Sequence, residues 1–572
     1  MSNKIKGIGA SNGIAVAKVY ILDEQPIVIP TTKAKDVQSE LDLINSSINK
    51  AKKDLESLQA IAKEKLGEEK AAIFEAHASI LQDPAMAEEF VALIKEQNYN
   101  ASRAIDEVAK KYIEMFGAME DVYFRERAAD IKDVTERLIR YVLKMPVLDL
   151  ASINDEVIIV AEDLTPSQTA QLNPNYVKGF ACNVGGRTSH AAIMARSLEI
   201  PAVLGLKTIL SSVKENDILA IDGSTGEVEL NPSDKLVWEK KAKKFAQEKV
   251  ELEQFKNKKT ITKDGFDKFI LEGNIGSPKD VAAVIENGGE GVGLFRSEFL
   301  YMDNDHFPTE EEQFEAYKQV VVDMNGKMTV IRTLDIGGDK KLSYFEFPEE
   351  MNPFLGYRAI RFTMDRKDIF KDQIRALLRA SAFGPVGIMF PMIATIDEFV
   401  GAKKFTLACK AELEKEGVKV GSDLQIGMMV EIPAAAINAE NFAKHADFFS
   451  VGTNDLIQYS MAADRMSENV TYLYQPFNPS ILRLLKMTID GAHKHGKWAG
   501  MCGEMAGEPE AVPLLMGLGL DAYSMSATSI TKARSIMAKL TLSETQELAK
   551  KAIECETSSE VLELVNQLMS TK

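Results

Sequence analysis

Hydrophobic residues recur at alternating steps of three and four positions between Val37 and Ala62, within a segment that runs from about Thr32 to Met145. Within this segment the only proline is Pro84, and the only glycines are Gly67 and Gly117. The apolar positions that carry the repeat are Val37, Leu41, Ile44, Ile48, Ala51, Leu55, Leu58 and Ala62. Such spacing forms one apolar stripe along a long helix, which packs on another helix. The pattern predicts a helical bundle.

The residues on either side of this segment have the character of β-strands. The chain up to about Ile29 is apolar and β-branched, with glycines at positions 7, 9 and 13. After Pro146, apolar runs occur at residues 156–160, 177–181 and 218–223. Short strands and glycine turns indicate a compact α+β domain. Because domain termini often lie close together, such a domain tolerates an insertion. We therefore expect residues 1–31 and 146–231 to form one domain, with the helical bundle of residues 32–145 inserted into it.

The segment 232–259 is predicted to be a connecting helix, capped by Ser233-Asp234 after Pro232. Residues 260–572 then repeat a strand-then-helix rhythm. Apolar strand candidates begin at Phe269, Val292, Thr329, Val386, Ile426, Phe448, Trp498 and Ala522. Segments rich in helix-favouring residues separate most of these strands, as in residues 371–381 and 434–443. Eight such units favour a (β/α)8 TIM barrel, although a doubly wound sheet fits the periodicity nearly as well. The fold class predicted is therefore multidomain α/β.

Composition and charge exclude several classes of function for this protein. The net charge is −17, which argues against a general nucleic-acid binder because phosphate backbones require a positive footprint. No run approaches the roughly 20 apolar residues that span a bilayer, so no membrane insertion is expected. The first four residues do not open a signal peptide. Four scattered cysteines form neither a disulfide framework nor a zinc cluster. We expect a cytoplasmic protein.

The first candidate site is the stretch Gly185–Arg196, which reads GGRTSHAAIMAR. Two glycines form a tight loop, Thr188 or Ser189 can cap, and the following residues favour a helix. His190 therefore falls in the first helical turn, where free backbone N–H groups and the helix dipole favour an anion. A histidine that accepts a phosphoryl group would suit this position. A histidine that lies near a helix cap incidentally is an equally good interpretation of the local pattern.

The second candidate site consists of polar residues at predicted strand ends of the barrel. Arginines there suit a ligand with phosphate and carboxylate groups, because a guanidinium binds either group bidentately. Two carboxylates that follow consecutive strands suit Mg²⁺, which prefers a few protein oxygens together with substrate oxygens. The alternative is that each charge is an ordinary exposed loop residue. The residues are Arg296, Arg332, Glu431, Asn454, Asp455 and Arg465.

The third candidate is Cys502, which follows a short apolar strand. Neighbouring anions in a phosphate-rich pocket would raise the pKa of its thiol and keep the thiol protonated. That environment suits a proton donor better than a nucleophile. An inert core cysteine is the alternative, and it is our interpretation for Cys182, Cys409 and Cys555.

Together these motifs resemble enzyme I of the bacterial phosphotransferase system, a phosphoenolpyruvate–protein phosphotransferase family. The resemblance covers essentially the whole chain. Its fold implies a swivelling phosphohistidine domain (1–31 and 146–231), a helical domain (32–145) that docks the carrier protein HPr, and a C-terminal barrel (260–572) that dimerises. The motifs are GGRTSHAAIMAR, GVGLFRSEFLYM, VIRTLDIGGDK, DFFSVGTNDLIQY and WAGMCGEMAG.

The resemblance also implies a role for each candidate residue. His190 would be the phosphorylated histidine, and Cys502 would protonate the enolate. Glu431 and Asp455 would bind Mg²⁺, with Mn²⁺ as a possible substitute because both ions prefer oxygen ligands. Lys340 and Arg358 are weaker assignments near the same pocket. The residues that would hold phosphoenolpyruvate are Arg296, Arg332, Asn454, Asp455 and Arg465.

The implied activity is transfer of the phosphoryl group of phosphoenolpyruvate to His190 and then to HPr, as the first step of sugar uptake. Related dikinases share two of the motifs but need an ATP-binding domain upstream, and no glycine-rich nucleotide loop precedes Pro146. A catalytically silent phosphocarrier or regulatory scaffold is a second alternative. A lyase on the same barrel is a third.

Overall fold

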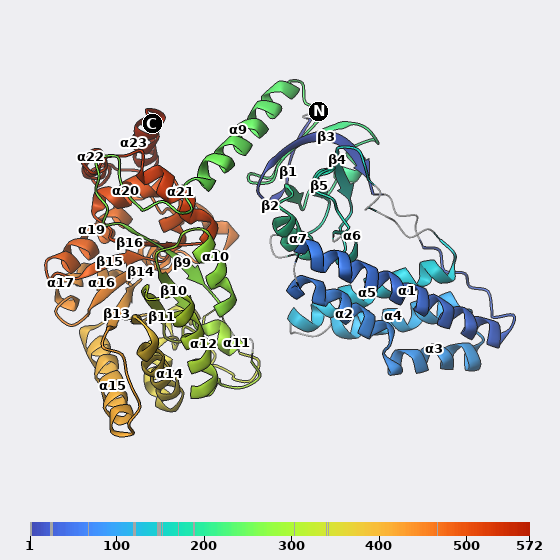
Figure 1. Ribbon diagram of the computed structural model, residues 1–572, viewed down its shortest axis with the longest axis horizontal. Coiled ribbons are helices and arrows are strands. Elements are labelled where there is room, and N and C mark those ends of the chain that lie inside the picture. The colour runs from blue at the N-terminus through green and yellow to red at the C-terminus, as the bar shows by residue number, and fades with distance from the viewer. Residues whose placement is uncertain are drawn as a thin grey trace. The chain divides into compact units, whose positions relative to one another are not determined.

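The computed structural model divides the chain into two compact units, Met1–Lys249 and Val250–Lys572. A β-sheet and a helical bundle make up most of the first unit, and a barrel makes up the second (Figure 1). The structure describes residues 3–22, 27–66, 68–117, 122–145, 150, 153–169, 171–186, 189–302, 304–338, 340, 342–465 and 467–572.

One eight-stranded sheet forms the α/β part of the first unit. Its strands are β1 (Lys4–Lys6), β2 (Ile8–Ser11), β3 (Ile14–Ile21), β4 (Val157–Ala161), β5 (Val177–Cys182), β6 (Ala202–Leu204), β7 (Ile218–Asp222) and β8 (Glu227–Leu230). Their order across the sheet is β1-β8-β7-β3-β4-β5-β6-β2. β3 pairs with β4 in parallel and with β7 antiparallel. Strands from before and after the helical segment therefore share one sheet, which confirms that the bundle is an insertion in an α/β domain.

The inserted bundle contains five long helices among its described residues. They are α1 (Val37–Leu66), α2 (Glu68–Leu81), α3 (Pro84–Gln97), α4 (Ala101–Gly117) and α5 (Val122–Val142). The predicted apolar stripe lies in its core, since Ala51 and Leu55 are at most 1% exposed. Pro84 begins α3, and the Asp83 side chain accepts a hydrogen bond from the Met86 backbone N–H at 3.0 Å. The segment's single proline therefore starts a helix, where its missing N–H costs nothing.

Shorter helices complete the first unit. They are α6 (Pro166–Thr169), α7 (His190–Leu198) and α8 (Ile209–Ser212). Met194 of α7 packs into the core of the helical bundle. The predicted connecting helix is α9 (Lys235–Glu253), and Asp234 accepts a hydrogen bond from the Val237 N–H at 3.3 Å at its start. The cap predicted before this helix is therefore present.

The second unit is a closed barrel of parallel strands. The strands are β9 (Ile270–Ile275), β10 (Val292–Arg296), β11 (Thr329–Arg332), β12 (Val386–Phe390), β13 (Leu424–Val430), β14 (Phe448–Val451), β15 (Trp498–Met501) and β16 (Ala522–Met525). β16 pairs with β9 and closes the sheet on itself. This closure confirms the TIM barrel and excludes the doubly wound sheet.

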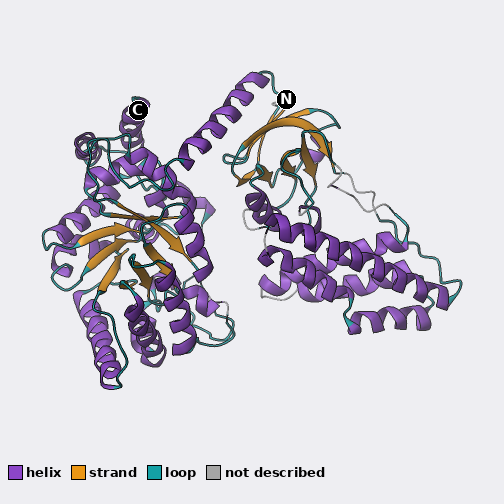
Figure 2. Ribbon diagram, viewed as in Figure 1, coloured by secondary structure: helices purple, strands orange, loops and turns teal. Residues whose placement is uncertain are grey.

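Helices surround the strands of the barrel (Figure 2). They are α10 (Val281–Glu286), α11 (Glu298–Met302), α12 (Glu310–Asp323), α13 (Ile360–Asp365), α14 (Lys367–Ala380), α15 (Ile396–Lys415), α16 (Pro433–Ile437), α17 (Ala439–Phe442), α18 (Thr453–Met461), α19 (Pro479–His493), α20 (Ala511–Leu518), α21 (Ala527–Met537), α22 (Leu542–Ala552) and α23 (Ser558–Ser570). The helix expected over residues 434–443 is divided at Asn438 into α16 and α17.

An apolar layer fills the barrel interior. The Phe448 ring stacks on Trp498 with 4.5 Å between ring centroids and 3° between ring planes. Gly427 makes room for this pair, because a Cβ there would lie 2.6 Å from the Cδ1 and Cε1 atoms of the Phe448 ring. The residues buried in this layer are Leu294, Val330, Met389, Met429, Phe448 and Cys502. The layer supports the strand ends from which the candidate site is built.

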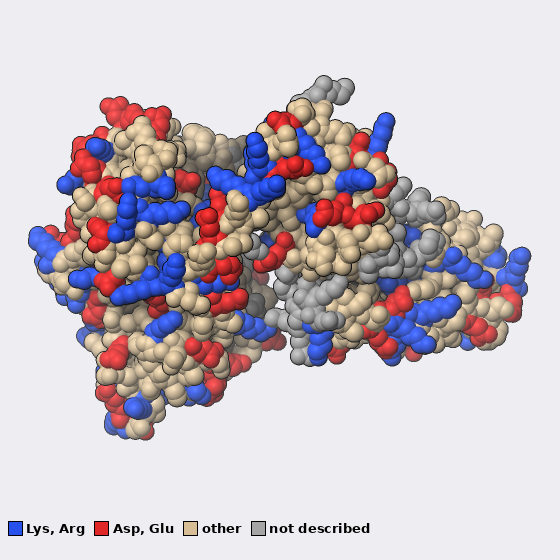
Figure 3. Space-filling view, turned by 45° about the horizontal axis from the view of Figure 1, so that its top comes forward, with Lys and Arg blue, Asp and Glu red and all other residues tan. Residues whose placement is uncertain are grey.

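None of the helices described is long and apolar enough to cross a bilayer. Lys and Arg side chains lie among Asp and Glu side chains over the face shown in Figure 3.

Replacement of Phe448 by alanine should destabilise the barrel by about 3–5 kcal/mol, because it leaves a cavity in the apolar layer. Of the two tryptophans, Trp498 lies in the barrel. Its fluorescence in a Trp238→Phe background therefore reports urea unfolding of the barrel alone. Phe383, which is 49% exposed, provides the matched control, and Phe383→Ala should cost about 1 kcal/mol or less. Equal losses for the two variants would contradict this account of the layer.

Candidate functional site

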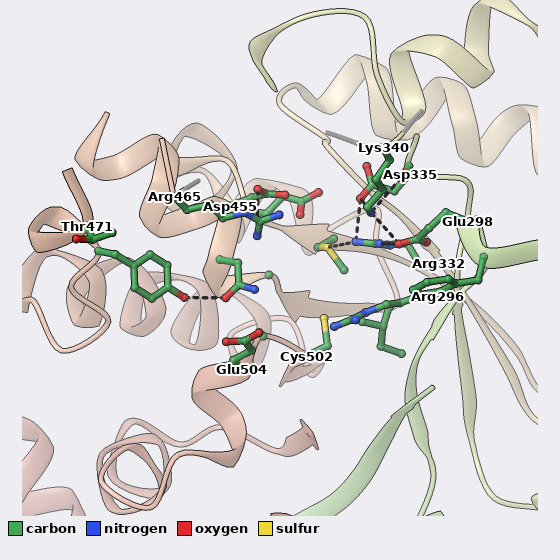
Figure 4. A pocket seen from close by; sticks show the side chains of 18 residues that line it. Arg296, Glu298, Arg332, Asp335, Lys340, Asp455, Arg465, Thr471, Cys502 and Glu504 are labelled. Carbon is green, nitrogen blue, oxygen red and sulfur yellow. Dashed lines mark hydrogen bonds and ion pairs between the residues drawn. The ribbon is translucent and has the colours of Figure 1, made fainter. Parts of the chain in front are cut away.

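A cavity of about 560 Å³ opens at the carboxyl ends of the barrel strands. Every candidate residue selected from the barrel sequence lines it (Figure 4). These residues are Arg296, Arg332, Glu431, Asn454, Asp455, Arg465 and Cys502. Lys340 also lines the cavity. So do two carboxylates that the sequence pattern did not single out, Glu298 and Asp335.

Four charged side chains form a closed ring on one wall of the cavity, which we call the charge quartet (Glu298, Arg332, Asp335 and Lys340). Arg332 Nη2 donates to Glu298 Oε1, and Arg332 Nη1 lies 3.1 Å from Asp335 Oδ2. Lys340 Nζ donates to the same two oxygens, at 2.8 Å and 3.0 Å. Each cation therefore lies between the same two carboxylates, and the ring alternates in sign.

Arg358 connects the charge quartet to the opposite side of the cavity. Its Nη2 donates to Asp335 Oδ1 at 2.8 Å and lies 3.6 Å from Asp455 Oδ2. Burial alone would raise the pKa of Asp335, but Lys340, Arg332 and Arg358 hold that pKa well below its usual value. Asp335 is therefore an ionised carboxylate at neutral pH.

The backbone next to Arg358 is strained. Ala359 has φ 52° and ψ −127°, a region that residues other than glycine rarely occupy and that costs on the order of 1–3 kcal/mol. Ala359 is fully buried, and its N–H donates to the Ile336 carbonyl at 3.0 Å. This hydrogen bond and the surrounding packing hold the turn that aims Arg358 at the two aspartates.

Glu431 and Asp455 form a pair of buried carboxylates. Glu431 Oε1 accepts a hydrogen bond from the Met392 backbone N–H at 2.6 Å. Burial, together with the negative charges of Asp455 and Asp335, raises the pKa of Glu431 to about 8. A carboxylate pair whose ionised form is disfavoured in this way suits a divalent cation, whose charge would remove the repulsion. No cluster of three or more acidic, His or Cys side chains in the described chain could hold a metal alone, so a cation here would also need oxygens from a ligand.

Arg296 and Arg465 differ in the polar contacts that they make with other residues of the protein. Arg296 has no hydrogen bond or ion pair with any described residue, and its guanidinium points toward Cys502 (Figure 4). Arg465 Nη1 lies 3.9 Å from Asp455 Oδ1. Asn454 Oδ1 accepts a hydrogen bond from the Tyr474 hydroxyl at 2.8 Å. Arg296 is therefore the cation best placed to receive an anionic ligand.

Cys502 lies at the base of the cavity and is 3% exposed. Its Sγ lies 3.8 Å from the Val451 carbonyl oxygen. Burial raises the pKa of its thiol, while Ser450 and Arg332 act in the opposite direction. The thiol is therefore protonated at neutral pH, as expected from the sequence, but burial contributes more to this shift than the neighbouring anions do. Cys182 and Cys409 are buried in apolar cores.

Several buried polar atoms in the cavity have no hydrogen-bond partner among the residues that the structure describes. Such atoms are uncommon, because each costs about 1–3 kcal/mol unless water, an ion or a ligand satisfies it. Their concentration here indicates that the cavity is built to hold a polar ligand. The atoms are Glu298 Oε2, Arg332 Nε and Asp455 Oδ1.

His190 belongs to the first unit, where it is the first residue of α7. Ser189 is the N-cap, and its side chain accepts a hydrogen bond from the Ala192 N–H at 3.3 Å. The His190 side chain and residues 187–188 lie outside what the structure describes. The side chains of Glu68 and Glu69 do so too; in the sequence these two residues, with Glu75 and Asp83, would give the helical domain an acidic surface. The sequence pattern thus located the cap correctly, and Ser189 rather than Thr188 provides it.

Glu298 and Asp335 were not selected from the sequence, although both lie inside the motifs quoted there. Glu298 follows Arg296 by two residues, and Asp335 follows Arg332 by three. Their acidic side chains alone did not mark them as residues of the site, because a lone carboxylate beside a strand end usually faces solvent. Only the fold shows that both are about 1% exposed and paired with cations.

Comparisons with known proteins agree with this arrangement. Family models match residues 6–127 (PEP-utilising enzyme, N-terminal), 153–226 (PEP-utilising enzyme, mobile domain) and 249–542 (PEP-utilising enzyme, PEP-binding domain). The chain is 60% identical to the phosphoenolpyruvate-protein phosphotransferase of Mycoplasma capricolum subsp. capricolum over 572 residues, 100% of both chains. It is 52% identical to that of Staphylococcus carnosus and 54% identical to that of Listeria monocytogenes, over 99% of each chain.

Among solved structures, the NMR solution structure of Enzyme I (nEIt) is 36% identical and covers 42% of this chain and 99% of its own, with a TM-score of 0.39. The full-length identity to the three curated relatives is sufficient to assign the family. The chain belongs to the family of phosphoenolpyruvate–protein phosphotransferases.

Proposed function

We propose that this chain transfers the phosphoryl group of phosphoenolpyruvate to His190 and from there to a histidine of the carrier protein HPr, releasing pyruvate. This would be the first step of sugar uptake by the bacterial phosphotransferase system. The observation that carries the proposal is the cavity at the barrel strand ends, where an unpaired guanidinium, a protonated thiol and two mutually repelling carboxylates line one space. A cytoplasmic homodimer, expected from the sequence resemblance, is part of the same proposal.

Substrate binding would use the cations of the cavity. Phosphoenolpyruvate carries a phosphate and a carboxylate, and guanidinium groups match both geometrically. Among the residues that the structure describes, Arg296 has no partner, and the Nε of Arg332 has no hydrogen-bond partner while its Nη atoms contact Glu298 and Asp335. Arg465, Asn454 and Asp455 line the side opposite this ring and would complete the substrate contacts.

Glu431 and Asp455 would hold Mg²⁺, or Mn²⁺, together with substrate oxygens. When bound, the ion supplies positive charge that offsets the negative charge of the transferring phosphoryl group. The donor set fits, because Asp455 Oδ1 is buried without a hydrogen bond from any described residue and Glu431 is hard to ionise alone.

The transfer itself would be an in-line displacement. A neutral imidazole nitrogen of His190 forms the new P–N bond as the P–O bond to the enolate breaks. Arg296 and Arg332 stabilise the charge that develops on the phosphoryl oxygens. Cys502 then gives its proton to the methylene carbon of the enolate, which makes pyruvate and draws the transfer forward.

The acceptor histidine must meet the barrel cavity first and the carrier protein afterwards. We infer that the phosphohistidine domain therefore moves as a rigid body, with hinges near residues 145–149 and near residue 231 or residues 258–260. Residues 146–149 lie outside the described part of the chain. An acidic surface that includes Glu75 and Asp83 would attract a basic patch on the carrier.

The alternatives have less support. A dikinase is less well supported because the curated relatives that match this chain over at least 99% of both lengths are named phosphoenolpyruvate-protein phosphotransferase. A silent scaffold would not require that Arg296, Arg332, Glu431, Asp455 and Cys502 line one cavity.

The decisive experiment is incubation of the parent protein and His190→Ala with radiolabelled phosphoenolpyruvate and Mg²⁺. We expect an acid-labile, alkali-stable label on the parent alone, which passes to added HPr. Pyruvate release without protein labelling would instead indicate a lyase or phosphatase on the barrel. Neither label nor pyruvate would indicate the silent scaffold.

A Cys502→Ser variant should fold and accept label from phosphoenolpyruvate but release pyruvate slowly, because a hydroxyl is a weaker acid than a thiol. We expect a fall of roughly 10²-fold, the scale of losing one proton donor. Rapid quench separates labelling of His190 from pyruvate formation. Cys409→Ser, which changes a thiol buried away from the cavity, should leave both rates unchanged. Undiminished pyruvate release by Cys502→Ser would remove Cys502 from the reaction.

A Glu431→Gln variant should be as stable as the parent in metal-free buffer, or more stable by on the order of 1 kcal/mol. Gln is always neutral, whereas the Glu431 carboxyl must either be ionised beside Asp455 or take up a proton when the chain folds. The Met392 N–H can still donate to the amide oxygen. Addition of Mg²⁺ together with inorganic phosphate, which supplies ligand oxygens, should raise the thermal midpoint of the parent above its value with phosphate alone, but should not do so for the variant. Glu412→Gln, at a half-exposed surface pair, should behave like the parent. A marked loss of stability in metal-free Glu431→Gln would be evidence against a cation site here.

A further inference from the structure

Glu298 is the member of the charge quartet whose role neither the motifs nor the proposed reaction explains. It is the first residue of α11, and its side chain is 1% exposed. Arg332, Asp335 and Lys340 come from β11 and the segment that follows it, whereas Glu298 follows β10. Glu298 therefore ties the segment that carries Lys340 to the strand end that carries Arg296.

The way Glu298 uses its two oxygens differs from that of a purely structural ion pair. Its Oε1 accepts from both Arg332 and Lys340, while its buried Oε2 has no hydrogen-bond partner among the described residues. Glu310 provides the contrast, because Arg375 binds one of its oxygens at 2.6 Å and Arg379 binds the other at 2.7 Å. A carboxylate that served only to hold helices together would be satisfied on both oxygens, as Glu310 is.

The charge of Glu298 also affects how strongly the cavity attracts anions. With two cations and two carboxylates, the charge quartet has no net charge. The cations beyond it that line or border the cavity are Arg296, Arg358 and Arg465. Without Glu298 the ring would carry an uncompensated positive charge, which would strengthen binding of any anion but leave Arg332 and Lys340 less fixed.

We propose that Glu298 is a positioning residue that holds Arg332 and Lys340 in the geometry required by the transition state, at the expense of ground-state affinity for anions. The inference rests on the proposed function, in which these cations face the transferring phosphoryl group. Fixed donors accelerate a reaction only when they are better placed for the transition state than for the substrate. Glu298 has this effect because it neutralises the two cations and restricts them together.

The test compares Glu298→Gln, Glu298→Asp and Glu310→Gln with the parent. Steady-state pyruvate release with excess HPr and Mg²⁺ gives kcat and KM for phosphoenolpyruvate, and competition by inorganic phosphate gives its Ki. We expect Glu298→Gln to lower kcat about 10-fold or more, the lower range for losing oriented donors. Its KM and its Ki for phosphate should be unchanged or lower, because the cavity has become more positive.

The other two variants separate charge from geometry. Glu298→Asp keeps the charge but is one methylene shorter, so it should restore the parent Ki while its kcat stays between those of the parent and Glu298→Gln. Glu310→Gln removes a carboxylate from the same barrel that also accepts from two cations, and it should keep the parent values of all three constants. Thermal unfolding is recorded for every variant.

Three results would overturn the proposal: a kcat for Glu298→Gln within twofold of the parent, a loss confined to a higher KM, or an equal loss in Glu310→Gln. If Glu298→Gln does not fold, Glu298→Asp decides, and a parent-like kcat in that variant would refute the positioning role. If the parent itself releases no pyruvate from phosphoenolpyruvate, the proposed function fails instead, and the two failures are thereby distinguished.

Discussion

The burial of Asp335 among three cations is the interaction on which the rest of the site depends. Arg332, Lys340 and Arg358 all reach this one carboxylate, which is 1% exposed. Removal of a single partner from a buried ion pair is strongly destabilising, because it leaves an uncompensated charge in a medium of low dielectric. The cluster therefore keeps one arrangement, in which the Arg332 guanidinium and the Lys340 ammonium line the cavity while the buried Arg358 holds Asp335. An exposed set of the same residues would hold no fixed geometry.

The barrel makes this cluster possible by bringing strand ends together above an apolar layer. Phe448 and Trp498 fill the interior below the cavity, so water does not reach the charges from that side. The segment after β11 is held in place by an aromatic cluster, in which Phe362 packs against Phe345 and Phe347 with 5.4 Å and 5.0 Å between ring centroids. This packing supports the strained turn at Ala359, which in turn directs Arg358 toward Asp335 and Asp455. Apolar packing thus fixes the positions of the charged side chains of the site, which would otherwise be mobile or repel one another.

The sequence was sufficient for those features that are encoded locally. Hydrophobic periodicity predicted the strand starts to within two residues, with Ile426 two residues inside β13 and Phe269 one residue before β9. Residues at strand ends were also predictable, because a parallel barrel brings every carboxyl end to one face. Glu298 and Asp335 could not be found in this way. Glu298 contacts Arg332, 34 residues away in the sequence, and Asp335 contacts Arg358, 23 residues away. No local sequence pattern indicates such contacts.

The low dielectric of the cavity has three chemical consequences that belong together. It keeps the Cys502 thiol protonated, since burial raises the pKa of that group. It makes ionisation of Glu431 beside Asp455 unfavourable, which favours a cation at that position. It also strengthens every contact between a guanidinium and a phosphate oxygen, because charges interact more strongly away from water. The proposed proton donor, cation site and phosphate site therefore depend on one physical condition. Exposure of these side chains to water would weaken all three at once, so the burial of the groups is itself part of the chemistry of the site.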